Sequence, residues 1–386
     1  MYYKTALLGA VSLSLVSSAL AQDELTDETT LDTVIVEGSR LNQTETEVGS
    51  SVTIITAEDI DALGFDFALD AVAAAPGVTV NTNGAFGGQA SVRIRGAASE
   101  QTLVLIDGIP VNDPTSPGGG FNFARLDTEN IERIEVLKGP QSTLWGTDAI
   151  GGVVSITTKR PDEGLGGSAF AEYGSFNTIR GGASVGNAND TGDFRLAVVG
   201  TSSDGISKAD ENNGNSEDDA YEALTLSAKG GLNLGRDARL SANVLWTNAE
   251  SGFDTSSGGV VFDADNVSET EELSANISLT GSLFDDRLEN LLLVGHTDID
   301  RQNFSGGAPS VSAEGDRMVY RYQGTLSIND QNTVAFGAER EETTSRDDDT
   351  SIDGLFAFYE FKPTEQVTLT GGIRMDDHER LGSETT

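Results

Sequence analysis

The second half of the chain alternates hydrophobic and polar residues with a period of two. Leu240, Ala242, Val244 and Trp246, for example, alternate with polar neighbours. The same pattern returns in residues 273–283 and 367–376, and we count about eleven such segments between 166 and 377. Strands of about ten residues with one apolar and one polar face are typical of a wall between lipid and a wet lumen. A soluble β-sandwich, whose strands also alternate, is the alternative.

Residues 32–160 have a different pattern, in which short helices and strands follow one another. Thr56, followed by Glu58 and Asp59, predicts the start of a helix with a threonine cap and acidic residues in its first turn. Residues 67–72 predict a second short helix, which ends before Pro76-Gly77. Strands are predicted at residues 78–80, 91–96, 102–108, 131–137 and 153–158, and the nearly continuous apolar run in 102–108 predicts burial on both faces.

The first 21 residues resemble a secretory signal peptide. Lys4 gives a weakly positive start, residues 6–16 are apolar, and Ala19-Leu20-Ala21 offers a small-x-small cleavage site. The apolar run is shorter than a helix needs to cross a bilayer, and a short N-terminal anchor is the alternative. The signal predicts export across the inner membrane.

Composition excludes several classes of function. The net charge is -38, with 62 acidic and 24 basic residues, which opposes nucleic acid as a partner because its phosphates need Lys and Arg. No cysteine is present, so the chain has no disulfide or thiolate chemistry. His296 and His378 lack metal-ligand spacing, and no nucleophile elbow or phosphate loop occurs. We therefore expect no enzyme activity and no covalent cofactor.

The stretch from Leu126 to Arg160 (LDTENIERIEVLKGPQSTLWGTDAIGGVVSITTKR) resembles the end of the plug domain of TonB-dependent outer-membrane receptors. This resemblance implies an α+β plug domain inside an antiparallel transmembrane β-barrel, in the outer membrane of a Gram-negative cell. Such barrels close at about 22 strands, so about half of a barrel is expected here. The expected organisation is a signal peptide (1–21), a disordered N-terminus with the TonB box (22–40), the plug (41–160) and a partial barrel (161–386).

One segment resembles the TonB box, which such receptors offer to the TonB energy-transducing protein of the inner membrane. It consists of Asp32, Thr33, Val34, Ile35, Val36 and Glu37. A β-branched, apolar segment beside an acidic stretch can add as a strand to the edge of a partner sheet. The alternative is that these residues form the first strand of the plug.

Two plug cations match motifs of the family. Arg95 lies in Ile94-Arg95-Gly96, and Lys138 precedes Gly139-Pro140 where the family has arginine. The resemblance implies that they pair with glutamates of the barrel wall, although a lysine loses the two-pronged pairing of arginine. Ordinary ion pairing between plug and wall, without a switching role, is the alternative.

The resemblance places the ligand on outward-facing plug loops at 81–89 and 113–121. The expected substrate-binding residues are Asn83, Phe86, Gln89, Asn112, Asp113 and Phe121. Asparagine and glycine allow hydrogen bonds and close approach, and phenylalanine supplies apolar contact. Plain solvent-facing loops are the alternative.

The motif Trp145–Val154 and the loop Asp254–Gly258 resemble the cobalamin transporter branch of the family. That branch uses calcium to order its substrate loops, and oxygen-rich clusters suit a hard cation. The candidate calcium ligands are Asp210, Glu211, Asp218, Asp219, Asp263 and Asp265. Their spacing is not that of an EF-hand, and solvated acidic loops are the alternative.

We therefore expect a TonB-dependent receptor for energised uptake of cobalamin or a related corrinoid, with TonB, the ligand and outer-membrane lipid as partners. A ferric siderophore receptor of the same architecture is one alternative. A surface-sensing protein that binds ligand without transport is another. Because an open sheet would leave unpaired backbone groups in lipid, we expect the sequence to be a fragment or the product of a truncated gene.

Overall fold

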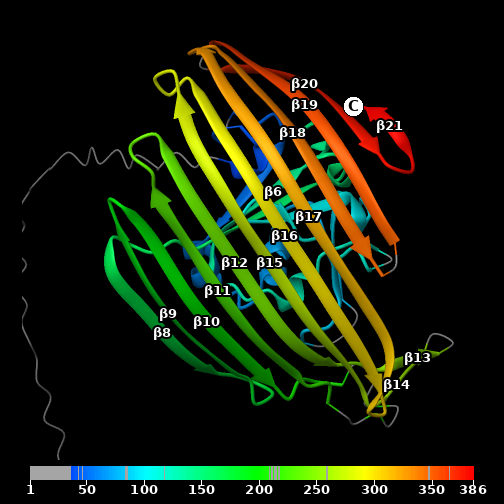
Figure 1. The fold of residues 1–386 in the computed structure, drawn as a ribbon. Coiled ribbons are helices and arrows are strands. Elements are labelled where there is room, and N and C mark those ends of the chain that lie inside the picture. Colours follow the sequence, from blue (N-terminus) through cyan, green and yellow to red (C-terminus); the bar gives the residue numbers. More distant parts are fainter. Residues whose placement is uncertain are drawn as a thin grey trace, which may run out of the picture. The chain divides into compact units, whose positions relative to one another are not determined.

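The structure is a computed structural model that describes residues 36–386, except 42, 46, 83–85, 117, 208, 210, 211, 213, 214, 216, 217, 258, 259, 347 and 365. The signal peptide and residues 32–35 of the predicted TonB box lie outside the described residues. No helix in the described ranges is long and apolar enough to cross a membrane. The described part contains the plug domain and a curved sheet, here called the wall (Figure 1).

The plug is built on a five-stranded mixed sheet in the order β1-β6-β7-β4-β5. The strands β4 and β7 are parallel, and the other neighbours are antiparallel. The bounds are β1 (Ser51–Thr56), β4 (Thr102–Ile106), β5 (Ile109–Pro110), β6 (Ile131–Lys138) and β7 (Gly152–Thr158), with a separate hairpin of β2 (Val78–Thr82) and β3 (Ala90–Ile94). All five residues of β4 are buried, as the apolar run predicts.

Short helices cover this sheet. They are α1 (Ala57–Leu63), α2 (Ala68–Ala73) and α3 (Ser142–Trp145), with 3-10 turns η1 (Glu37–Ser39), η2 (Ser99–Gln101), η3 (Phe123–Arg125) and η4 (Thr147–Ala149). The cap predicted at Thr56 is present, because its hydroxyl accepts the N–H of Asp59 and the Asp59 carboxylate accepts the N–H of Thr56. The helix α1 ends at Gly64, which has a φ of 66°.

The wall is a sheet of twelve strands, of which eleven lie between residues 164 and 378, the number that the sequence predicts for this range, and the twelfth is the short strand at 382–385. Consecutive strands pair antiparallel, in the order β8 to β12 and then β15 to β21. Their bounds are β8 (Gly164–Tyr173), β9 (Ile179–Asn189), β10 (Gly192–Ser203), β11 (Tyr221–Asn233), β12 (Ala238–Gly252), β15 (Asn266–Leu283), β16 (Leu288–Ser305), β17 (Ala308–Asn329), β18 (Asn332–Ser345), β19 (Asp348–Thr364), β20 (Val367–His378) and β21 (Gly382–Thr385). A small hairpin, β13 (Thr255–Ser257) and β14 (Val260–Phe262), lies in the connection from β12 to β15.

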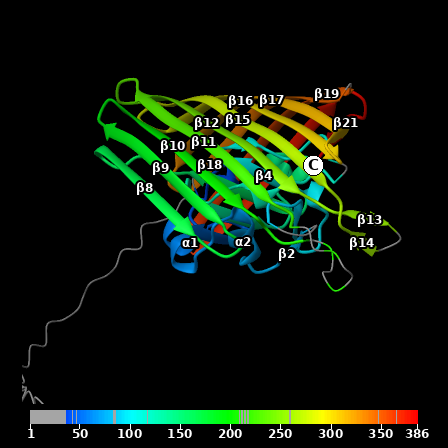
Figure 2. The same ribbon diagram turned by 90° about the horizontal axis from the view of Figure 1, so that it is seen from below.

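Seen from below, the wall curves around one side of the plug (Figure 2). Its longest connections, 204–220 and 253–265, leave one end of the sheet, and the opposite end has short turns at 190–191, 234–237 and 284–287. Short turns are typical of the periplasmic end of such walls and long loops of the extracellular end.

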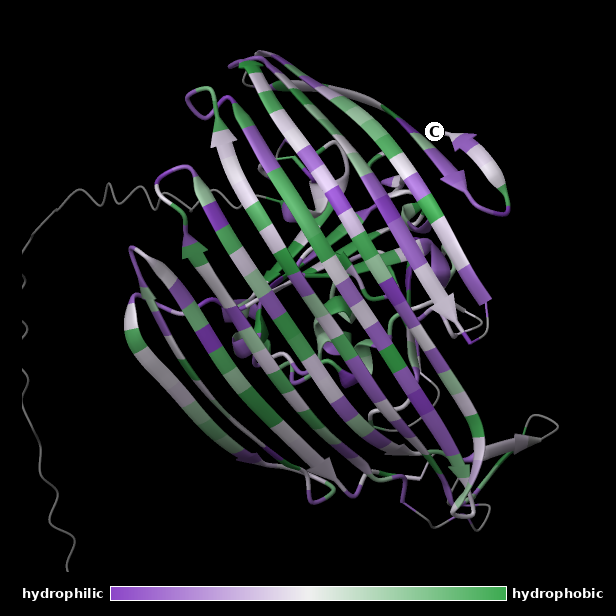
Figure 3. Ribbon diagram, in the orientation of Figure 1, coloured by the Kyte–Doolittle hydropathy of each residue, from purple (hydrophilic) through white to green (hydrophobic). Residues whose placement is uncertain are grey.

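Hydrophobic and hydrophilic residues alternate along many strands of the wall (Figure 3), and their exposure shows that the two faces differ in polarity. Ile277 and Ile373 are 59% and 57% exposed on the face away from the plug. Asn276 and Arg374, their neighbours in sequence, are 5% and 4% exposed on the face toward the plug. Apolar side chains outside and polar ones inside are the reverse of a soluble sandwich, and they suit a wall in lipid.

Candidate functional site

The chain enters the plug through a packed segment, residues 36–40. The side chain of Val36 is fully buried in an apolar cluster that includes Leu137 and Val153. A Cβ on Gly38 would lie 2.6 Å from Cδ1 of Leu137, so only glycine fits there without a shift. The sequence predicted disorder as far as residue 40. That prediction is wrong for residues 36–40, because this segment buries apolar side chains against the plug.

Glu135 on β6 binds this segment through hydrogen bonds to its backbone. Its carboxylate accepts hydrogen bonds from the N–H groups of Glu37 and Gly38, at 3.2 and 2.9 Å. Arg133 lies 2.8 Å from Glu135 and 2.7 Å from the Glu37 carboxylate. Burial raises the pKa of Glu135, although the Gly38 N–H and Arg133 act in the opposite direction. The segment is therefore fixed by a buried carboxyl group whose pKa lies above its ordinary value.

Arg40 fixes the same segment to the wall. Its guanidinium lies 3.7 Å from the centre of the Trp145 ring and 2.8 Å from the carboxylate of Glu339 on β18. Glu339 also accepts a hydrogen bond from Arg321 and lies 3.5 Å from Arg374. We call Arg40, Glu339, Arg321 and Arg374 the arginine cluster. Because three guanidinium groups share one carboxylate, loss of Glu339 would leave buried positive charge unpaired.

Among the further ion pairs that join the plug to the wall are the following four. Asp127 accepts two hydrogen bonds from Arg180, both of 2.7 Å, which is the two-pronged geometry that arginine favours. The remaining pairs are Asp107 with Lys229 at 2.9 Å, Asp113 with Arg301 at 3.0 Å, and Arg125 with Glu272. Sequence reasoning missed these residues except Asp113, which it predicted as a ligand contact and not as a partner of the wall. The alternation of inward and outward side chains along each wall strand is the signal that could have identified Lys229, Glu272 and Arg301, because it places them on the inner face.

Arg95 and Lys138, the two cations predicted to pair with the wall, lie near each other. A Cβ on Gly77 would be 3.8 Å from Cγ of Arg95 and 3.9 Å from Cδ of Lys138. The ammonium of Lys138 donates to the Thr53 hydroxyl at 2.6 Å. Burial and, second, the charge of Arg95 lower the pKa of Lys138. Within the described ranges neither residue forms an ion pair with the wall, and their pairing with wall glutamates stays a prediction.

The first predicted substrate loop is attached to the wall through aromatic rings. Phe86 packs edge-to-face against Phe67 and against Tyr221 of β11, with ring centres 5.1 and 5.5 Å apart. Gly87 has a φ of 69°, and a Cβ there would overlap the Tyr221 ring. Gln89 is exposed, and Asn83 lies outside the described residues. Phe86 thus positions the loop, and Gln89 is available to a ligand.

The second predicted loop is held by side chains within it. Asn112 accepts the N–H of Val104 at 2.8 Å and donates to the carbonyls of Thr102 and Gly119, both at 3.0 Å. Asp113 accepts from the N–H and hydroxyl of Thr115, both at 2.7 Å, besides its ion pair to the wall. Phe121 packs edge-to-face on Phe123, with ring centres 5.0 Å apart. Three of the predicted ligand-binding side chains are therefore buried, and they already contact other groups of the protein in this structure.

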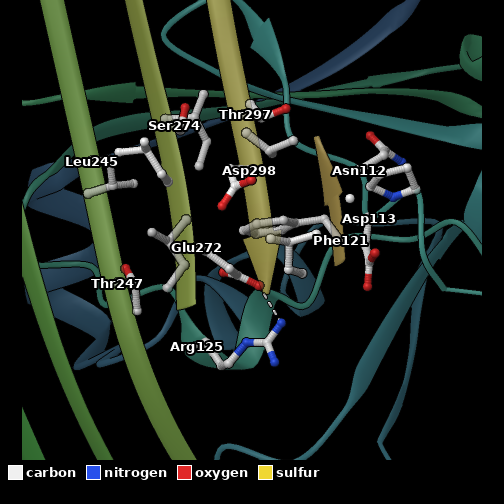
Figure 4. A pocket seen from close by; sticks show the side chains of 17 residues that line it. Asn112, Asp113, Phe121, Arg125, Leu245, Thr247, Glu272, Ser274, Thr297 and Asp298 are labelled. Carbon is white, nitrogen blue, oxygen red and sulfur yellow. Dashed lines mark hydrogen bonds and ion pairs between the residues drawn. The ribbon is translucent and has the colours of Figure 1, made fainter. Parts of the chain in front are cut away.

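A hollow of about 50 Å³ lies between this loop and the wall. Figure 4 shows Asn112, Asp113 and Phe121 on the plug side and Leu245 and Glu272 among the wall residues that line it. The ion pair of Arg125 with Glu272 is drawn there at one edge of the hollow. The cavity is large enough for water but not for a corrinoid, so a large ligand needs another surface or a moved loop.

The predicted calcium ligands are only partly described, since Asp210 and Glu211 are not. Asp218 is exposed, and Asp219 is buried. Asp263 accepts from Ser207 at 3.5 Å, and the carbonyl of Asp265 accepts from Gly306 at 2.7 Å. Among the described residues no three acidic or histidine side chains gather as metal ligands do. The calcium site stays a prediction.

Comparison with known proteins decides the family. A model of the TonB-dependent receptor plug domain matches residues 44–153. The chain carries a TonB-dependent receptor plug. The resemblance that the sequence suggested is confirmed, as is the fold of a plug with part of a receptor barrel. The protein is located in the outer membrane of a Gram-negative cell.

The curated relatives include vitamin B12 transporters (BtuB). The chain is 26% identical to that of Photobacterium profundum over 93% of its own length and 59% of the relative's. For Vibrio vulnificus strain CMCP6 the values are 29%, 92% and 57%. A second Vibrio vulnificus transporter is 34% identical over 198 residues, 32% of its length. The chain thus spans little more than half the length of the first two.

Solved structures of siderophore receptors have the same fold. The siderophore receptor PirA from Acinetobacter baumannii superposes with a TM-score of 0.73 at 19% identity, over 89% of this chain and 58% of that one. The ferric enterobactin receptor PfeA from Pseudomonas aeruginosa gives 0.71 at 18% identity, over 86% and 59%. Identities this low show the fold alone. The matched proteins carry the names of transporters and receptors, not of enzymes.

Proposed function

We propose that this protein takes up cobalamin or a related corrinoid across the outer membrane, with energy from TonB. The observation that carries the proposal is the similarity to vitamin B12 transporters along more than nine-tenths of the chain, from the plug into the wall. The polarity of the wall supports it, because the apolar outer face suits lipid. The protein would do no covalent chemistry.

The energy transducer would bind the segment that begins at Asp32. The last two residues of the predicted box, Val36 and Glu37, lead directly into the segment held by Glu135 and by the arginine cluster. Strand addition to a partner would use the backbone N–H groups of Glu37 and Gly38, which Glu135 now accepts. Deletion of residues 32–37 is expected to abolish energised uptake and leave ligand binding intact. Unchanged uptake would remove this assignment.

We place the ligand on the outer side of the plug loops, with Gln89 and Asn83 as direct contacts. Phe86, Asn112, Asp113 and Phe121 support the loops that present them. A Gln89→Ala chain is expected to bind cobalamin more weakly, because an exposed amide that donates and accepts is lost. Exposed Gln331, in the turn between β17 and β18 at the end of the wall with the short turns, supplies the control, Gln331→Ala, which should bind normally.

Calcium is proposed as an ion that orders the connections 204–220 and 253–265, through Asp218, Asp219, Asp263 and Asp265 together with Asp210 and Glu211. Oxygen donors of these types suit calcium. Titration of the full chain with calcium by calorimetry tests this directly. Heat of binding that disappears in a chain with Asp263→Asn and Asp265→Asn supports the site. No heat at millimolar calcium rejects it.

Competition binding tests the cargo. The purified full chain is expected to bind cobalamin in detergent, and a ferric siderophore of the catecholate class should not displace it. Displacement by the siderophore with no binding of cobalamin would instead support the alternative receptor of the same architecture.

A further inference from the structure

Two hollows lie against the inner face of the same four wall strands, β12, β15, β16 and β17. The first, of about 50 Å³, touches Thr247 on β12 and Thr297 on β16. The second, of about 560 Å³, touches Arg239 on β12 and Asn290 on β16. The second hollow lies at the end of the sheet with the short turns, since residues 235–238 border it. The same four strands therefore border two hollows, one beside the plug loop and one nearer the periplasmic end.

The hairpin of β4 and β5 lies between these hollows. Ile106, at the end of β4, lines the first hollow. Leu291, which lines the second, packs against the cluster that contains Ile109 of β5. The turn between the strands has positive φ values of 46° at Asp107 and 85° at Gly108. A tight turn of the plug thus separates the two spaces.

The tip of the hairpin fits a notch in the wall. Ile109 is 1% exposed and packs on Leu293 and Val319. It also faces Gly295 of β16, where a Cβ would lie 2.5 Å from Cγ2 and 3.3 Å from Cβ of Ile109. Glycine at this position leaves room for the isoleucine, so contact between hairpin and wall depends on this pair.

Polar contacts complete the seat of the hairpin. The Lys229 ammonium lies 2.9 Å from the Asp107 carboxylate. Asn276 donates to the carbonyl of Asp107 at 3.2 Å, and Arg321 donates to the carbonyl of Gly108 at 2.8 Å. Three wall strands thus bind two successive residues of one turn.

Arg321 connects this turn to the beginning of the plug. Its Nε donates to Glu339 while its Nη1 donates to Gly108. Glu339 is the residue that pairs with Arg40, next to the predicted TonB box. One arginine therefore contacts both the carboxylate that holds the N-terminal segment and the hairpin that separates the hollows.

We propose that the hairpin Ile106–Pro110 is the gate of the solute path and that Arg321 couples it to the segment at Arg40. The proposal rests on the proposed transport function. When the partner withdraws Arg40, Glu339 is left to Arg321 and Arg374, and Arg321 can turn fully to the carboxylate and release Gly108. The hairpin then leaves its notch and joins the two hollows along β12, β15, β16 and β17.

A reversible lock tests the gate. The chain has no cysteine, and the 3.3 Å between a Cβ at Gly295 and that of Ile109 approaches the spacing of about 3.5–4.5 Å in disulfides. In cells with the variant Ile109→Cys/Gly295→Cys, oxidation is expected to abolish cobalamin uptake without loss of binding, and a reductant should restore uptake. Full uptake by the oxidised, cross-linked chain would overturn the proposal.

Two control pairs show whether the position of the lock matters. Ser168 and Ser184, whose hydroxyls are 2.8 Å apart, join two wall strands without the plug. Thr143 and Gly372 join α3 to β20, where a Cβ on the glycine would be 2.8 Å from Cγ2 of the threonine. Cysteines at either pair are expected to leave uptake intact when oxidised. Equal loss with the Thr143/Gly372 pair would mean that the whole plug must move, which overturns the hairpin gate.

A second readout does not depend on cobalamin. Gly295→Val should push Ile109 from its notch, and cells should become sensitive to a glycopeptide antibiotic that the intact outer membrane excludes. Ile109→Ala in the same chain should reduce this sensitivity by removing the overlap. No rise in sensitivity at normal surface amounts overturns the gate. If Gly295→Val does not assemble, the lock alone decides. Absence of cobalamin uptake by the unmodified chain would instead refute the proposed function.

Discussion

The guanidinium of Arg40 lies 2.8 Å from the carboxylate of Glu339, although 299 residues separate them. This ion pair ties the beginning of the plug to β18 of the wall, and the side chains are 3% and 9% exposed. The pair is therefore desolvated, and its partners depend on each other more than those of a surface ion pair.

Removal of Glu339 is expected to be costly. In Glu339→Gln the three buried arginines lose their shared charge, and the stability of the protein should fall by about 3–5 kcal/mol, the range for breaking a buried pair. Arg40→Met removes one of the three cations, and the double variant should be less destabilised than the sum of the two. Thermal unfolding in detergent, combined as a double-mutant cycle, measures the difference. Strict additivity would show that the two residues are not coupled.

The fit of Gly87 against Tyr221 predicts a specific effect of a small substitution. Gly87→Ala is expected to displace the first substrate loop and weaken cobalamin binding, because its Cβ overlaps the ring. Gly64→Ala is the matched control, since its φ of 66° imposes similar backbone strain, about 1–2 kcal/mol, with no atom within 4 Å of the new Cβ. Equal binding by the two variants would show that Tyr221 does not position the loop.

Asn112 predicts a loss of stability without a direct loss of ligand contact. Its amide satisfies one N–H and two carbonyl groups, and Asn112→Ala leaves these groups unpaired at about 1–3 kcal/mol. Exposed Asn81 provides the control variant, Asn81→Ala, which should unfold as the unmodified chain does. Unfolding curves for the three proteins check this. An unchanged curve for Asn112→Ala would contradict the role assigned to its amide.

The raised pKa of Glu135 implies that the stability of the folded protein depends on pH. Since its pKa is raised in the folded state, the native protein binds more protons than the unfolded chain from about pH 4.3, the ordinary value for glutamate, up to the raised pKa. The contribution of this group to stability is therefore complete at lower pH and is lost as pH rises through that window. Glu135→Gln should remove this part of the pH dependence. Identical profiles of unfolding against pH for the two proteins would contradict the assignment.

Local rules predicted much of the fold. The cap at Thr56 and the stop at Pro76-Gly77 predicted α1 and α2, and the apolar run in 102–108 predicted a strand buried on both faces, which the structure has at 102–106. The alternation around Ile277 and Ile373 predicted which face of the wall is apolar. These features depend on residues that are close together in sequence, so the pattern of a single segment is enough to predict them.

The parts that sequence did not predict depend on distant partners. Nothing near Arg40 indicates that Glu339 will reach it, and so residues 36–40 were expected to be disordered. Asn112 and Asp113 were predicted to contact ligand because they are polar loop residues, whereas their present partners are backbone groups within 10 residues and Arg301 across the interface. Polarity indicates that a side chain needs a partner, but not which partner it finds.

Uptake of labelled cobalamin by the full chain is the most direct test of the account. Cells that lack their own outer-membrane cobalamin transporter would express the chain, once with a functional TonB protein and once without it. Accumulation is expected only with TonB, and binding at the cell surface should be equal in both. Binding without accumulation in either strain, or accumulation that does not depend on TonB, would contradict it.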